Sequence, residues 1–119
     1  MGPAGVRAAG VPPSARAVVA RVALHCRDLL FGSKVEGALR AGGHEVTRDA
    51  HGADVVVVDL TDPDLPWPEG TGAPRLGFYS HVDQETRRRA EAAGFDLVVP
   101  RSRMNREAAA LVEKLLPPG

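Results

Sequence analysis

The stretch Ala53–Pro63 reads ADVVVVDLTDP and places four consecutive valines directly before an aspartate, Asp59. β-branched residues favour strands, and an apolar run without polar alternation is typical of a strand that is buried on both faces. Such strands belong to parallel sheets that are covered on both sides. We therefore expect Val55–Val58 to be the central strand of an α/β domain. Asp59 should project from its carboxyl end and not be buried within the strand.

Strand-like and helix-like patterns alternate on both sides of this stretch. Strands are expected at Val18–His25, His44–Arg48 (a weak edge strand), Leu76–Tyr79 and Leu97–Val99, and helices from Asp28 to Gly42, over Asp83–Ala93 and from Ser102 onward. Asp83 and Ser102 should cap their helices. The alternation predicts right-handed βαβ units and a flavodoxin-like three-layer sandwich, with five parallel strands in the order 2-1-3-4-5. Thr61–Pro74 contains four prolines, so we expect the third helix of such a fold to be shortened or absent.

The composition narrows the class of protein. With 119 residues, 44% of them hydrophobic and a formal net charge of zero, the chain suits one globular domain, which we place at residues 17–116 after a disordered leader at 1–16. Zero net charge and the lack of a DNA-binding motif argue against nucleic-acid binding. No apolar run approaches the roughly 20 residues that span a membrane, and the N-terminus lacks a signal-peptide core. We expect a cytoplasmic protein.

Chemically capable side chains follow several of the predicted strands. In a parallel sheet the carboxyl ends of the strands meet at one edge, where ligands bind near the switch between strands one and three. The residues expected at this edge are His25, Cys26, Arg27 and Asp28 after the first strand, Asp59 after the third, Ser80 and His81 after the fourth, and Arg101 after the fifth.

This order of residues resembles the CheY-like receiver domains of bacterial response regulators. The resemblance implies that Asp59 occupies the position of the phosphoryl-accepting aspartate, with the proline four residues later also matching. Ser80 matches the hydroxyl that contacts the phosphate, and Arg101 occupies the position of a lysine that does so. In that family an acidic pair after the first strand binds Mg²⁺, and a histidine kinase supplies the phosphoryl group.

The acidic pair is missing from this chain. Its positions fall on Cys26 and Arg27, while Asp28 lies one residue late and is a candidate helix cap. A thiol and a guanidinium do not replace the carboxylates that hold Mg²⁺. We therefore expect a degenerate, non-enzymatic pseudo-receiver with no metal and no cofactor. Asp59 should form an ion pair with Arg27 and Arg101, or simply cap the turn at 60–63.

A second interpretation uses the same edge differently. Cys26, His25 and His81 would then serve a small-ligand-binding or weakly catalytic domain. A single buried cysteine is more often a small hydrophobic residue, and an unusually acidic thiol would favour the enzyme. His44 and His51 are interpreted as loop residues, and Trp67 is expected to pack onto the sheet.

We expect a protein partner on the surface of the last two helices. This face carries several arginines, and it includes the last strand and helix, through which a homodimer could also form. The candidate contact residues are Arg87, Arg88, Arg103 and Arg106.

Overall fold

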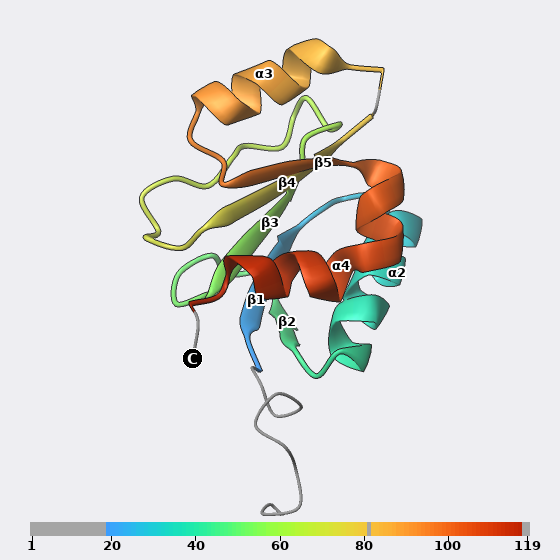
Figure 1. Ribbon diagram of the computed structural model, residues 1–119, viewed down its shortest axis with the longest axis vertical. Coiled ribbons are helices and arrows are strands. Elements are labelled where there is room, and N and C mark those ends of the chain that lie inside the picture. Colours follow the sequence, from blue (N-terminus) through green and yellow to red (C-terminus); the bar gives the residue numbers. More distant parts are fainter. Residues whose placement is uncertain (1–18, 81, 118–119) are drawn as a thin grey trace, which may run out of the picture.

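A computed structural model describes residues 19–80 and 82–117 of the chain. Its strands are β1 (Arg21–His25), β2 (Glu45–Thr47), β3 (Val55–Asp59), β4 (Arg75–Tyr79) and β5 (Leu97–Pro100). They form one sheet in the order β2-β1-β3-β4-β5 (Figure 1), and every neighbouring pair is parallel. The predicted sheet is confirmed. The predicted leader, Val18 and His81 lie outside the described residues.

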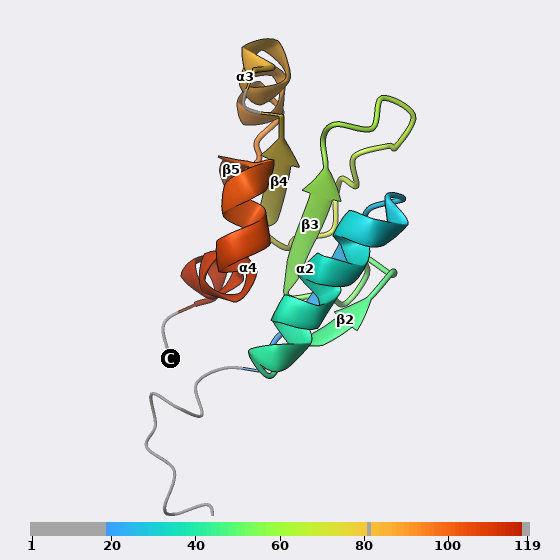
Figure 2. The same cartoon turned by 90° about the vertical axis from the view of Figure 1, so that its right-hand side faces the viewer.

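The helices of the described residues are α2 (Leu29–Ala41), α3 (Gln84–Ala92) and α4 (Arg101–Leu115). Helices α2 and α4 pack together on one face of the sheet, and α3 lies at the other side beside β4 and β5 (Figure 2). The backbone of α4 departs from helical geometry at Glu107. No helix within residues 19–80 and 82–117 is long and apolar enough to cross a membrane.

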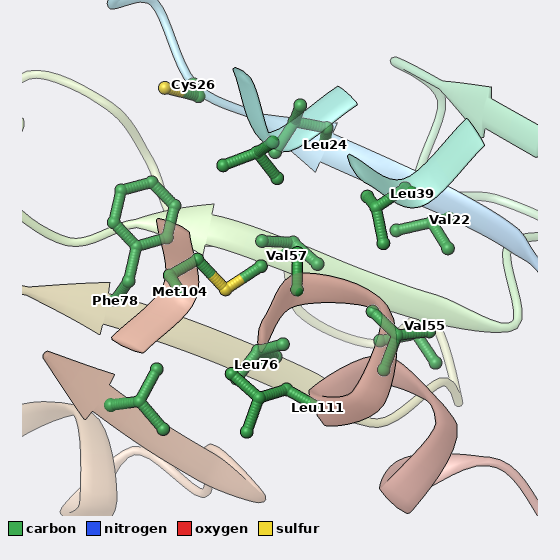
Figure 3. Close-up of a cluster of buried hydrophobic side chains, with 14 of the residues drawn as sticks. Val22, Leu24, Cys26, Leu39, Val55, Val57, Leu76, Phe78, Met104 and Leu111 are labelled. Atoms are coloured by element: carbon green, nitrogen blue, oxygen red, sulfur yellow. The ribbon is translucent and has the colours of Figure 1, made fainter. Parts of the chain in front are cut away.

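The four valines of β3 are buried because both faces of the sheet are covered. Val55 and Val57 point into the core beneath α2 and α4, where Leu39 and Leu111 meet them (Figure 3). The alternate valines, at 56 and 58, lie in a second core on the opposite face. All four have an exposed fraction of 0%. The apolar run was therefore a correct signal for a doubly covered central strand.

The second core is covered in part by loops. As predicted, no helix forms between β3 and β4, where residues 60–74 cross the sheet as turns and extended chain. Trp67 in this crossover packs edge-on against Phe95, with ring centroids 5.2 Å apart. The expected packing role of Trp67 is confirmed, and it compensates for the missing helix on this face.

Two of the three predictions about helix starts are confirmed. The carboxylate of Asp28 accepts a hydrogen bond from the backbone of Phe31, and that of Asp83 accepts one from the backbone of Thr86. The predicted Ser102 cap is wrong. The N-cap lies two residues earlier, at Pro100 at the end of β5, so helix α4 begins at Arg101 and has no side-chain cap. Pro100 already has the extended conformation of an N-cap residue, so the strand passes straight into the helix.

His44 has a structural role that its loop position did not indicate. It lies outside the helices and strands, yet only 3% of it is exposed. Its Nδ1 accepts a hydrogen bond of 3.1 Å from the backbone N–H of Ala20, and its Nε2 lies 3.0 Å from the carboxylate of Glu113 on α4. The imidazole thus joins the start of β1 to the last helix. The interpretation of His44 as a simple loop residue was incomplete.

Candidate functional site

The register of the sheet brings the predicted residues to one edge. His25 pairs with Val58, Asp59 with Phe78, and Tyr79 with Pro100. The residues that follow these strands are therefore neighbours, as the sequence predicted. The side chains at this edge nevertheless pair differently from the expectation.

Asp59 is the last residue of β3 and is buried, with an exposed fraction of 3%. Its Oδ1 accepts a hydrogen bond of 2.9 Å from the backbone N–H of Thr61 and a second, short one from the Thr61 hydroxyl. Its Oδ2 accepts a weaker contact of 3.6 Å from the thiol of Cys26. Both carboxylate oxygens are thus occupied by donors of this chain. Asp59 does not project freely from the edge, and the interpretation as a turn cap is the correct one.

Arg27 pairs with Asp62 instead of Asp59. Its Nε and Nη2 donate to the two oxygens of Asp62 at 2.7 and 2.8 Å, a bidentate geometry. The guanidinium lowers the pKa of Asp62. Because Asp62 lies at the rim and Asp59 is buried, Arg27 reaches a carboxylate there without losing its hydration.

Arg101 likewise pairs with a different carboxylate. Its Nη2 donates to Asp28 at 2.7 Å, and its guanidinium carbon lies 4.2 Å from the centre of the Phe31 ring. Phe31 in turn packs on Phe78, with centroids 5.0 Å apart. The predicted ion pairs between Asp59 and these two arginines are therefore wrong.

Asp28 performs two tasks at once. The backbone N–H of Phe31 first, and Arg101 second, lower the pKa of its carboxyl group. Asp28 thereby starts α2 and ties it to the start of α4. Ser80 follows β4 and is half-buried, and its carbonyl oxygen accepts a hydrogen bond of 2.8 Å from the backbone N–H of Asp83.

Cys26 is a buried thiol. Its exposed fraction is 6%, and its sulfur lies 3.7 Å from the carbonyl oxygen of Asp28 as well as near Asp59. Burial and then the nearby negative charge of Asp59 raise the pKa of this thiol to about 11. A reactive cysteine needs the opposite, a stabilised thiolate. These properties favour a packing role over a nucleophilic one.

We therefore expect Cys26 to react slowly in the folded protein. At neutral pH its thiolate fraction is small and reagents have little access, so iodoacetamide should alkylate the native chain far more slowly than the chain unfolded in urea. Cys26 is the only cysteine, and intact mass reports its modification directly. Equal alkylation rates in the folded and unfolded states would contradict this prediction and would favour the enzymatic interpretation.

His25 lies one residue before Cys26 and on the opposite face of the strand. It is half-buried, and its Nε2 is buried with no hydrogen-bond partner. Burial, with a smaller effect of Arg48, lowers its pKa. The part of the proposed Cys26–His25–His81 cluster that the structure describes therefore places its two members on different sides of the sheet.

The four candidate contact arginines are exposed or half-buried on α3 and α4. Each pairs with a glutamate of its own helix: Arg87 with Glu91, Arg88 with Glu85, and both Arg103 and Arg106 with Glu107. The charges of Arg87 and Arg88 are thereby balanced, whereas Arg103 and Arg106 share the single carboxylate of Glu107. A partner that binds here meets a surface of both signs.

The residues at the edge do not fit a magnesium site. The carboxylates of Asp28, Asp59 and Asp62 are engaged by donors of this chain, and positions 26 and 27 supply a neutral thiol and a cation. Mg²⁺ is usually held by one or two carboxylates with water and phosphate oxygens. Residues 19–80 and 82–117 also contain no group of three or more His, Cys, Asp or Glu side chains arranged to hold a metal ion.

No family model matches the sequence, and the curated proteins contain no match either. Several solved structures share the fold. The Francisella response regulator 1452 receiver domain superposes with a TM-score of 0.63 at 15% identity, covering 81% of this chain and 95% of that one.

The fold is that of response-regulator receiver domains. The Burkholderia multivorans response regulator gives a TM-score of 0.61 at 16% identity, covering 86% of this chain and 98% of that one. Thermotoga maritima DrrB, an OmpR/PhoB homolog, gives 0.63 at 18% identity, with coverages of 82% and 52%. This chain thus spans about half of DrrB. Identities this low establish the receiver fold alone.

Sequence reasoning missed three residues of this edge. Thr61 donates hydrogen bonds to Asp59, and Asp62 accepts those of Arg27. The ring of Phe31 packs against the guanidinium of Arg101. The Asp-x-Thr spacing of residues 59–61 was the available signal, because an aspartate commonly accepts a hydrogen bond from the backbone two residues on. The other two contacts join residues distant in sequence and have no local signature.

Proposed function

We propose that this chain is a receiver-like signalling module that acts through protein contacts, with little or no Mg²⁺-dependent phosphorylation of Asp59. The observation that carries the proposal is the state of Asp59, whose two oxygens accept hydrogen bonds from Thr61 and Cys26. Phosphoryl transfer depends on positioning and on neutralising charge. An acceptor that is 3% exposed and internally bonded is poorly placed for an incoming phosphoryl donor.

The contacts of two arginines favour a single conformation of the module. Arg27 and Arg101 each form a short, charge-assisted contact with a carboxylate other than Asp59. Charge-assisted bonds of this kind are among the stronger side-chain interactions. We infer that they hold the loop after β1 and the start of α4 in one arrangement, so that the module presents a constant surface to its partner.

The proposed partner surface lies where α3, β5 and the start of α4 meet. Strand β5 forms one end of the sheet, so one side of it carries backbone groups without a strand partner. Val82, which precedes α3, is 77% exposed. Arg87 and Arg88 lie on α3, and Arg103 and Arg106 lie on α4, so the surface carries four arginines paired with three glutamates. A signalling protein is the proposed occupant, and a second copy of the chain is the alternative.

Phosphorylation is the decisive test. Incubation of the chain with acetyl phosphate and Mg²⁺, followed by intact mass, should leave it unmodified. A double variant, Cys26→Asp with Arg27→Asp, restores carboxylates beside Asp59 and should gain a Mg²⁺-dependent phosphoryl adduct. Adding Asp59→Asn to that variant should abolish the adduct. A stoichiometric adduct on Asp59 of the unaltered chain would refute the proposal.

A further inference from the structure

A cleft of about 230 Å³ lies on the loop-covered face of the sheet, between the crossover after β3 and helix α3. Leu60 and Thr86 form its buried part, while Trp67, Asp83 and Arg89 supply an aromatic ring and both signs of charge. The volume is below that of pockets for drug-sized ligands. It suits one molecule that is smaller than a typical drug.

The aromatic wall of the cleft is held in place. Trp67 packs edge-on against Phe95, and the guanidinium of Arg75 lies 4.4 Å from the centre of the Phe95 ring on the same cluster. Arg75 is fixed by the carbonyl oxygens of Pro68 and Ala93, on the crossover and just after α3. A wall fixed from both sides loses little conformational freedom when a ligand binds.

Arg89 differs from the other arginines of its helix. Arg87 and Arg88 form salt bridges with glutamates of α3, whereas Arg89 forms none with any residue of the described part of the chain. Its guanidinium lies 5.4 Å from the centre of the Trp67 ring. Arg89 also lines the cleft, and a guanidinium has five N–H donors with which to bind a carboxylate.

The opposite charge comes from Asp83 at the start of the same helix. Its carboxylate accepts hydrogen bonds from the backbone and hydroxyl of Thr86, and a carboxylate has about four acceptor positions in all. Asp62, the other acid of the cleft, is neutralised by Arg27. Asp83 and Arg89 both line the cleft, and the hydrogen bonds from Thr86 first, and the charge of Arg89 after them, lower the pKa of Asp83. The two charged groups are therefore close enough to bind the adjacent ammonium and carboxylate of one small molecule.

We infer that this cleft binds a small zwitterion of the α-amino-acid class, with its carboxylate on Arg89, its ammonium on Asp83 and its apolar side chain against Trp67. Thr61 also lines the cleft while it donates to Asp59. A bound molecule therefore contacts the turn that covers the Asp59 carboxylate. The inference does not depend on whether Asp59 is ever phosphorylated.

The test uses the intrinsic fluorescence of the full chain, because Trp67 is its only tryptophan. Each standard L-amino acid is titrated, and isothermal calorimetry is run on those that change the signal. At least one with an apolar side chain should bind. For L-leucine, the matched probes are 3-methylbutylamine, which lacks the carboxylate, and 4-methylpentanoate, which lacks the ammonium, and both should bind at least tenfold more weakly.

Substitutions test whether Arg89 and Asp83 bind the two charged groups of the ligand. Arg89→Gln and Asp83→Asn should each weaken binding by tenfold or more by calorimetry, and asparagine keeps the helix cap. Arg88→Gln, which changes the neighbouring arginine, should leave the affinity unchanged. The inference is overturned if no amino acid binds, if either single-charge probe binds as tightly as L-leucine, or if Arg89→Gln binds like the unaltered chain.

Discussion

Replacing Phe78 by alanine is expected to lower the free energy of unfolding by about 3–5 kcal/mol. Phe78 is fully buried in β4. Its ring packs against the ring of Phe31, and the guanidinium of Arg101 lies over the Phe31 ring. Removing the ring leaves a cavity beneath α2 and α4, and the core relaxes into it only partly. Small domains have a total free energy of unfolding of about 5–15 kcal/mol. This substitution alone should therefore remove a large part of the stability of the domain.

Urea denaturation followed by circular dichroism measures the effect. Phe78→Leu is the matched control, and it should cost less because leucine fills more of the space. If Phe78→Ala cost less than about 1 kcal/mol, the ring would not be part of a close-packed core. The packing of Phe31 and Arg101 above it would then also need revision.

Replacing His44 by alanine is expected to lower the free energy of unfolding by about 2–3 kcal/mol. The change removes the acceptor of the buried Ala20 N–H, and leaving such a donor without a partner costs about 1–3 kcal/mol. It also breaks the link from the start of β1 to Glu113 on α4. The substitution therefore affects two elements that are far apart in the sequence.

Two further variants separate these contributions. His44→Asn keeps an acceptor near the position of Nδ1 and should recover part of the loss. Glu113→Gln should cost less than about 1 kcal/mol, because that side chain is 49% exposed and the amide oxygen of glutamine can still accept a hydrogen bond from Nε2. Urea unfolding of the three variants compares them directly. Equal losses for His44→Ala and Glu113→Gln would mean that the Ala20 hydrogen bond has no energetic role.

The fold was predictable because its signals are local and repeated. The valines of β3 indicated burial on both faces, and the prolines of residues 61–74 indicated a crossover without a helix. Asp28 and Asp83 cap helices through hydrogen bonds to residues only three positions further along the chain. Ser102 misled the prediction because a good capping residue lay two positions after Pro100, whose backbone had already set the helix start.

The side-chain pairing at the edge was not predictable in the same way. Two carboxylates three residues apart could pair with Arg27, Asp59 at the end of β3 and Asp62 in the crossover after it. The sequence alone does not distinguish them. The structure distinguishes them by burial, with Asp59 satisfied by Thr61 and Asp62 at the rim. An arginine loses less hydration by pairing at the rim. His44 shows the same limitation, because its partners are distant in sequence.

The crossover at residues 60–74 also determines where the length of this chain is free to change. Its tip contains Gly70 and Gly72, both with positive φ and with open space around them, and no regular backbone ladder passes through it. The entropy of closing a loop grows slowly, at about 0.6 kcal/mol for each doubling of its length. Extra residues accepted at this tip would leave β3 and β4 paired, which makes it the natural point of entry for an inserted tag or reporter domain.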